Sequence, residues 1–176
     1  MKIRLPNKEV IIVVLDLSRS MLKNVKGVNK IELALKILSS LPNNLAYTLI
    51  GFAKSSFPIL ETVSKDELIK ISERINCIRE IKYGSNPSDG LQDAVRAMFK
   101  YSNYGIKTIA ILLIWDGGKN EGVNLSTIKS LIEGYTKFLE IIISKRGLEL
   151  SGSSQRKFQI NGIKSAIKVI YDEILS

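Results

Sequence analysis

The apolar run Val10-Ile11-Ile12-Val13-Val14-Leu15 is the feature that most restricts the fold of this chain. A strand with one face in water alternates apolar and polar residues, whereas this run contains no polar residue. Such a run is typical of a strand buried on both faces of a parallel sheet. A second apolar run at 109–115 predicts another central strand over 107–115. Both strands stop abruptly at a carboxylate, Asp16 and Asp116.

The rest of the chain alternates helical and strand-like patterns. Strands are predicted at 2–5 (a short edge strand), 9–16, 45–53, 56–63, 107–115 and 138–144. Helices are predicted at 28–41, after a capping box at 64–67, after Pro87, at 125–137 and at 159–175, with 77–83 as a connector and 145–157 as a basic loop. This order predicts one domain over residues 1–176. Its expected fold is a Rossmann-like three-layer α/β/α arrangement, with a mainly parallel sheet and one antiparallel edge strand.

The composition removes several kinds of chemistry. The chain has no histidine, which excludes Ser-His and Cys-His nucleophile pairs and histidine-ligated zinc. The single cysteine, Cys77, rules out an internal disulfide and a multi-cysteine zinc site, so we expect it to pack as a small apolar residue. The apolar runs are too short to span a bilayer, and the N-terminus does not resemble a signal peptide. We therefore expect a cytoplasmic protein that is not an enzyme and does not contact a membrane.

The net charge raises the question of an anionic partner. The chain has 26 Lys and Arg against 17 Asp and Glu, a formal charge of +9 and a pI of about 9.6. One hypothesis is that Lys145, Arg146, Arg156 and Lys157 bind nucleic acid. A solvated, lysine-rich surface is the alternative, since no cluster of arginine and aromatic residues accompanies the charge.

Three polar loops carry the residues that best fit a chemical role. Asp16, Ser18 and Ser20 follow the first apolar strand, Ser85 precedes a helix, and Asp116 follows the second apolar strand. The loops after parallel strands gather at one edge of the sheet, so these side chains can converge. Carboxylate and hydroxyl oxygens without sulfur or imidazole suit a hard cation, Mg²⁺ first, with Mn²⁺ or Ca²⁺ as alternatives. Few carboxylates among neutral hydroxyls would leave the ion's charge partly uncompensated, which favours an Asp or Glu supplied by a partner protein.

The spacing of residues in the first loop excludes two familiar kinds of site. An EF-hand beginning at Asp16 needs glycine at its sixth position and a carboxylate at its twelfth, where this chain has Met21 and Gly27. An aspartate-nucleophile phosphatase needs a second acid two residues on, where Ser18 stands. The phosphate-binding and dinucleotide-binding glycine motifs do not occur. Metal-assisted phosphoester hydrolysis is the least favoured alternative, because the chain shows neither an obvious base nor a second metal site.

Segments 13–21, 84–91 and 111–117 carry a resemblance to a known family. The first contains Asp-x-Ser-x-Ser, and it resembles the metal-site motif of von Willebrand factor type A (vWA) domains. The other two resemble that family's Gly-Thr-Pro loop and its strand ending in Thr-Asp-Gly. Membership would imply a Rossmann-like sheet and a metal-ion-dependent adhesion site (MIDAS) used for protein–protein interaction. It would also imply these metal ligands: Asp16, Ser18, Ser20, Ser85 and Asp116, the last through water.

Two positions depart from the family pattern. Ser85 replaces the usual threonine, which keeps the hydroxyl but loses the methyl group that limits its rotamers. Trp115 replaces the threonine before Asp116. Trp115 and Arg19 are candidate contacts for a partner, with packing in the core or at the rim as the alternative for Trp115 and a surface role for Arg19.

Overall fold

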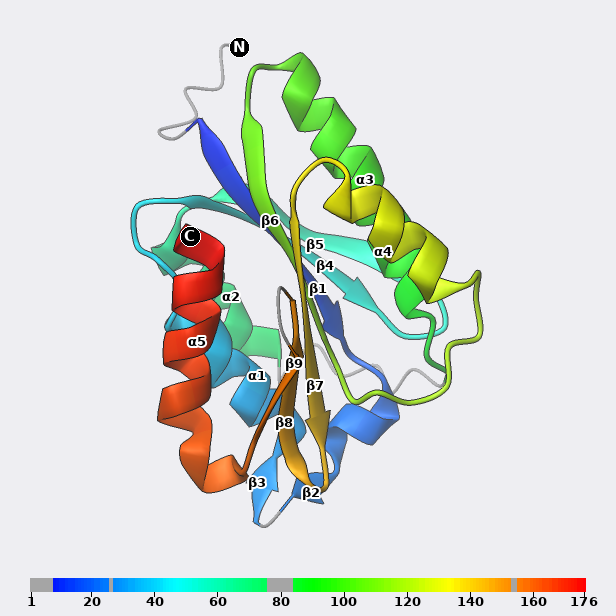
Figure 1. Cartoon of the computed structure of the whole chain (residues 1–176), viewed down its shortest axis with the longest axis vertical. Helices are drawn as coiled ribbons and strands as arrows, with labels where there is room; N and C mark the ends of the chain where they lie inside the picture. Colours follow the sequence, from blue (N-terminus) through cyan, green and yellow to red (C-terminus); the bar gives the residue numbers. More distant parts are fainter. Residues whose placement is uncertain (1–7, 26, 76–83, 153–154) are drawn as a thin grey trace.

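The computed structural model describes residues 8–25, 27–75, 84–152 and 155–176, and a mixed sheet forms its middle layer (Figure 1). The strands are β1 (Glu9–Asp16), β2 (Asn24–Val25), β3 (Val28–Asn29), β4 (Ala46–Phe52), β5 (Ser56–Val63), β6 (Lys107–Trp115), β7 (Lys137–Ser144), β8 (Gly147–Ser151) and β9 (Gln155–Phe158). The helices are α1 (Lys30–Ser39), α2 (Lys65–Ile75), α3 (Pro87–Asn103), α4 (Leu125–Glu133) and α5 (Ile163–Leu175), with 3₁₀ helices η1 (Arg19–Leu22) and η2 (Ile160–Gly162). The edge strand predicted at 2–5 and the connector at 77–83, with Cys77, lie outside the described residues.

The sheet has the order β5-β4-β1-β6-β7-β8-β9, with β1 between two parallel neighbours. Strands β4, β1, β6 and β7 are parallel, so their carboxyl ends lie at the same edge. Helices α1, α2 and α5 cover one face, and α3 and α4 cover the other (Figure 1). The predicted three-layer, Rossmann-like α/β/α fold is therefore confirmed.

The first apolar strand supplies both layers of the core. Every residue from Val10 to Leu15 is 0% exposed. Successive side chains of a strand point to opposite faces. The odd-numbered residues accordingly join the core beneath α1, α2 and α5, and the even-numbered residues join the core beneath α3 and α4. This burial on both faces is what the unbroken apolar run predicted.

The segment 145–157 is not the loop that the sequence predicted. Residues 147–151 and 155–158 form β8 and β9, which extend the sheet beyond β7 by antiparallel pairing. Leu148 and Leu150 are each 1% exposed in the core below α5, while Glu149 between them points the other way. The alternation is short and flanked by glycine and serine, so it is a weak strand signal. Antiparallel pairing thus occurs at both edges of the sheet, with β5 on β4 at the predicted edge.

Local hydrogen bonds determine where the helices begin and end. Asn29 caps α1 by accepting the N–H of Ile31 at 2.9 Å, so this helix begins at Lys30 rather than at residue 28. The capping box before α2 forms as predicted, since Ser64 Oγ accepts the N–H of Glu67 at 3.3 Å and the Glu67 carboxylate accepts the N–H of Ser64 at 3.0 Å. Gly134 ends α4 earlier than predicted. None of the described helices combines the length and apolar character that crossing a bilayer requires.

Gly90 allows α3 to approach the sheet closely, and its replacement tests this packing. A Cβ atom at position 90 would lie 2.7 Å from Val14 Cγ1 and 3.3 Å from Phe52 Cδ1. Alanine in a helix interior ordinarily adds up to about 1 kcal/mol of stability relative to glycine. We expect Gly90→Ala instead to lower the free energy of unfolding by about 1–3 kcal/mol, because the core is overpacked.

The measurement is urea denaturation followed by circular dichroism, with Gly134→Ala as the control. At Gly134 the nearest atom to an added Cβ is Leu131 O at 3.4 Å, an ordinary contact. A stabilised Gly90→Ala variant would show that α3 does not depend on this close approach.

Candidate metal centre

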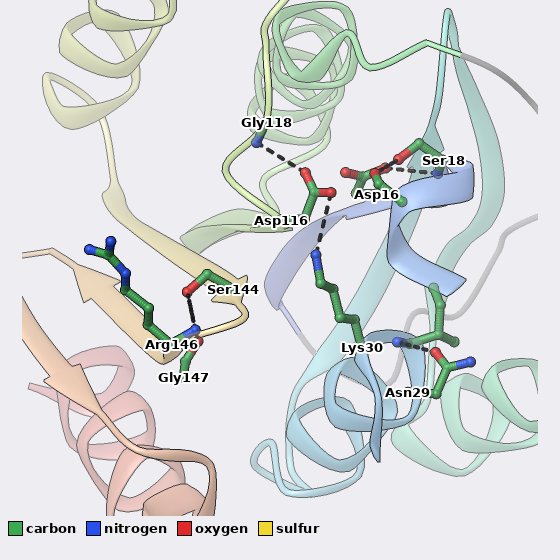
Figure 2. Close-up of polar contacts among 11 residues, drawn as sticks. Asp16, Ser18, Asn29, Lys30, Asp116, Gly118, Ser144, Arg146 and Gly147 are labelled. Carbon is green, nitrogen blue, oxygen red and sulfur yellow. Dashed lines mark hydrogen bonds and ion pairs between the residues drawn. The ribbon is translucent and has the colours of Figure 1, made fainter. Parts of the chain in front are cut away.

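The two strand-ending carboxylates lie on neighbouring strands at one edge of the sheet. Asp16 is the last residue of β1, and Asp116 directly follows the last residue of β6. The register pairs Leu15 with Ile114, so the two strands end within a residue of each other. Figure 2 shows the two side chains close together, with Ser18 beside Asp16. The parallel pairing of β1 and β6 is thus what brings these distant acids to one place.

The loop after β1 is held in a tight turn. Asp16 Oδ1 accepts the N–H of Ser18 at 2.8 Å, and the hydroxyls of Ser18 and Ser20 share a hydrogen bond of 2.9 Å. The N–H of Leu17 donates to Phe52 O at 2.8 Å, which ties the turn to β4. Met21 is 0% exposed and anchors η1 in the core. The loop therefore presents a buried carboxylate and two hydroxyls at the carboxyl edge of the sheet.

The segment with Ser85 is tied to the same edge from two sides. Asn86 N–H donates to Ala53 O, just beyond β4, at 2.7 Å. Glu121 N–H, in the loop after β6, donates to Ser85 O at 3.0 Å. Pro87 is the first residue of α3, as predicted, and Asn86 Oδ1 caps the helix. Ser85 thus lies between the ends of the strands that flank β1.

Two oxygens of this group are buried without hydrogen bonds. Asp16 Oδ2 and Ser85 Oγ have no hydrogen-bond partner among the described residues. A buried polar atom without a partner costs about 1–3 kcal/mol, and a charged one more. A cation would satisfy both oxygens, so the residues present fit a bound metal ion. Within the described part of the chain, no group of three or more His, Cys, Asp or Glu side chains is placed to hold a metal, so any ion here depends on the serine hydroxyls.

The electrostatics of Asp16 reflect this burial. Loss of contact with water raises the pKa of Asp16 to about 6. The hydrogen bonds from Ser18 lower this pKa, and the nearby negative charge of Asp116 raises it. In the absence of a cation, ionisation of the Asp16 carboxyl therefore lowers the stability of the folded protein.

Asp116 has a different environment, which the sequence did not reveal. Its Oδ1 accepts the N–H of Gly118 at 3.0 Å, and its Oδ2 lies 3.6 Å from Lys30 Nζ (Figure 2). Lys30 is 7% exposed and is the first residue of α1. The only feature of the sequence that could have pointed to Lys30 is its place directly after the Asn29 cap, where the helix dipole disfavours a cation. The structure thus adds Lys30 to the five residues expected at this site.

Trp115 packs in the core, which is the alternative to its candidate contact with a partner. The side chain is 5% exposed and packs in the core beneath α3 and α4. Its Nε1 donates to Glu140 Oε1 at 2.9 Å, and Glu140 is also paired with Lys129. Since Trp115 is the last residue of β6, strand alternation turns it to the α3 and α4 face. Arg19 lies exposed in η1, and its contact with a partner stays a prediction.

The four basic residues expected to bind nucleic acid do not gather on one face. Lys145 and Arg146 are exposed in the turn between β7 and β8. Arg156 and Lys157 are exposed neighbours on β9, so their side chains leave opposite faces of the sheet. Lys157 pairs in register with the acidic Glu149. This arrangement does not support the nucleic-acid alternative.

The raised pKa of Asp16 predicts how stability without metal depends on pH. The folded protein holds the Asp16 proton more tightly than the unfolded chain does, so ionisation costs folded stability. This cost is absent below about pH 4 and complete above about pH 6. The measured quantity is the free energy of unfolding of Asp16→Asn minus that of the wild type, both in EDTA. We expect this difference to rise by up to about 3 kcal/mol as the pH is raised from about 4 to about 6, because only the wild type bears the cost of ionising Asp16.

Urea denaturation of both proteins across this pH range makes the measurement. Carboxylates that do not interact with Asp16 titrate equally in the two proteins, so their contributions cancel in the difference. A difference that does not change with pH would contradict the raised pKa.

Comparison with known proteins identifies the fold. No model of a protein family matches the chain, and a search of curated proteins finds no match. Among solved structures, an aerotolerance-related membrane protein from Bacteroides fragilis, carrying multiple mutations to serines, is 20% identical with a TM-score of 0.71. That match covers 94% of this chain and 98% of the other.

Two further structures connect the fold with the family that the motifs resemble. Proximal thread matrix protein 1 from the mussel byssus, with a zinc-occupied MIDAS motif, is 19% identical with a TM-score of 0.56, covering 77% of this chain and 35% of that one. A von Willebrand factor type A protein from Catenulispora acidiphila is 18% identical with a TM-score of 0.52, covering 75% and 32%. The sequence motifs and the structural likeness agree, and the chain has the fold of a von Willebrand factor type A domain.

Proposed function

We propose that this chain is a protein-interaction module in which Mg²⁺ bridges the candidate metal centre to an Asp or Glu of a partner protein. The ligands from this chain are Asp16, Ser18, Ser20, Ser85 and Asp116. The observation that carries the proposal is the pair of buried oxygens, Asp16 Oδ2 and Ser85 Oγ, that have no hydrogen-bond partner among the described residues.

Without a ligand, these two oxygens lower the stability of the fold, because each is buried with no hydrogen-bond partner among the described residues. A bound ligand that pairs with them would remove this cost. They belong to segments far apart in the sequence, yet both lie at the carboxyl edge of the sheet. Buried polar atoms in proteins are almost always paired, so Asp16 Oδ2 and Ser85 Oγ, both without a partner among the described residues, suggest a missing ligand. A cation is the partner that both accept. Bound Mg²⁺ would supply a positive centre to which a carboxylate from outside can coordinate.

The choice of metal follows from the ligand atoms. The mussel protein's MIDAS motif holds zinc, which supports a divalent cation at this place in the fold. In this chain every proposed ligand is a carboxylate or hydroxyl oxygen. Zinc favours sulfur and nitrogen ligands, whereas an all-oxygen set suits Mg²⁺, with Mn²⁺ or Ca²⁺ as substitutes.

We propose a binding function rather than catalysis. The chain has no histidine to act as a general base near neutral pH. Asp16 belongs to the proposed ligand group, and a carboxylate that binds the cation cannot also serve as a free base. The proposed site holds a single metal, which does not favour the two-metal route to phosphoester hydrolysis.

Removing one ligand tests metal binding directly. We expect Ser85→Ala to weaken Mg²⁺ binding by about tenfold or more, since even indirect supports of metal ligands are worth that much. Asp16→Asn should weaken it further, because the ion loses a charged ligand. Isothermal titration calorimetry with MgCl₂ gives the dissociation constants.

Thr108→Val is the matched control for Ser85→Ala. Thr108 Oγ1 is also buried without a hydrogen-bond partner among the described residues, but it belongs to the opposite end of β6. The control should bind Mg²⁺ as the wild type does. Equal Mg²⁺ affinity of Ser85→Ala and the wild type would remove Ser85 from the site.

Binding to a partner should need both the metal and Asp16. We expect proteins captured from the native host by the wild-type chain in Mg²⁺ to be lost on addition of EDTA. They should also be lost with Asp16→Ala, because either change removes the bridge to the partner's carboxylate. Quantitative mass spectrometry of the captured proteins makes the comparison. A partner retained at full yield in EDTA would contradict the proposal.

A further inference from the structure

Lys30 occupies a position that a lysine does not favour. Its side chain is 8% exposed, and it stands at the first residue of α1, where the positive end of the helix dipole repels a cation. Burial of an ammonium group is costly unless an opposite charge lies nearby. The nearby opposite charge is Asp116, whose Oδ2 is 3.6 Å away and whose side chain is also 8% exposed. Figure 2 shows Lys30 reaching from α1 toward this carboxylate.

The position of Lys30 changes the charge balance of the metal centre. The sequence predicted an ion whose charge is only partly compensated, but the formal charges of Asp16 and Asp116 together equal that of a divalent ion. A loaded site without Lys30 would then be neutral and would attract an outside carboxylate only weakly. The ammonium of Lys30 adds a positive charge that nothing else in the proposed ligand set balances. Because the group is buried, water screens this charge poorly.

We propose that Lys30 is a resident counterion of Asp116 that couples metal binding to partner binding. Without metal, Lys30 holds Asp116 in place and lessens the repulsion between the two acids. When the metal enters, the ammonium opposes the ion, so the metal alone binds weakly. The loaded site keeps an excess positive charge, which a carboxylate from the partner neutralises. Metal and partner acid therefore strengthen each other's binding.

This coupling rests on the proposed function, and it makes metal binding depend on the presence of the partner's acid. The metal centre would fill when a partner presents its acid, rather than permanently. Reciprocity of binding free energies requires the acid to raise the metal affinity by the same factor as the metal raises the acid affinity. An acid that is present in solution, such as acetate, should therefore tighten Mg²⁺ binding by the wild type.

The test is calorimetric titration of MgCl₂ into the wild type and into Lys30→Met. Each titration is made with and without sodium acetate, and sodium chloride replaces the acetate so that the ionic strength stays equal. We expect Lys30→Met to bind Mg²⁺ at least about tenfold more tightly than the wild type without acetate, because a buried positive charge beside the ion is removed. Acetate should tighten Mg²⁺ binding by the wild type and have less effect on Lys30→Met. Lys30→Arg, which keeps the charge, should behave as the wild type does.

Lys129→Met is the matched control for the change in charge. Lys129 is paired with the buried Glu140, which is not a proposed ligand. We expect this control to change Mg²⁺ affinity less than about threefold, because its charge lies outside the proposed ligand set. Lys30→Gln provides a second neutral variant if Lys30→Met does not fold, since the amide can still donate a hydrogen bond to Asp116.

The outcomes separate the two proposals. Equal Mg²⁺ affinities of the wild type and both neutral variants would overturn the role of Lys30 and leave the metal site intact. Absence of Mg²⁺ binding by the wild type and by every Lys30 variant would overturn the metal site as well. Thermal unfolding in EDTA adds an independent readout: Lys30→Met should melt at a lower temperature than the wild type, and Mg²⁺ should raise its melting temperature by more.

Discussion

The burial of β1 on both faces is the constraint on which the rest of the structure depends. A strand that is apolar on both sides needs a layer of helices above and below the sheet, and parallel neighbours are joined through those helices. Parallel pairing then brings the strand-to-helix loops to one edge. Asp16 and Asp116 meet because β1 and β6 end together at that edge. The location of the candidate metal centre is therefore a consequence of how the core is packed.

The buried charged groups at that edge lower the stability of the fold. Asp16 has lost its contact with water, its Oδ2 has no hydrogen-bond partner among the described residues, and its pKa is raised to about 6. Lys30 is buried at the unfavourable end of a helix to stand beside Asp116. A core of apolar side chains would carry none of these costs. Such strain is typical of binding sites, where the missing partner is supplied by a ligand.

The sequence predicted the layers and the acidic edge well, and it failed where local patterns are weak. Long apolar runs and capping residues have strong local signals, so β1, β6 and the start of α3 agree with the predicted bounds. The pattern predicts a loop where β8 and β9 form a hairpin, because the two buried leucines of β8 are flanked by glycine and serine. The place of Trp115 at the end of an apolar strand left both packing in the core and contact with a partner open, and the structure shows packing in the core.

By itself, the sequence determined the fold class, the strand-ending carboxylates and the hydroxyls that accompany Asp16. These follow from residue type and from periodicity within short segments, which act through local geometry and burial. Only the tertiary structure decided that Ser85 lies at the same edge with an unpaired hydroxyl among the described residues, that Trp115 turns into the core, and that Lys30 stands beside Asp116. Each of these depends on the packing of a helix or loop against a strand far away in the chain, and no local pattern records such a contact.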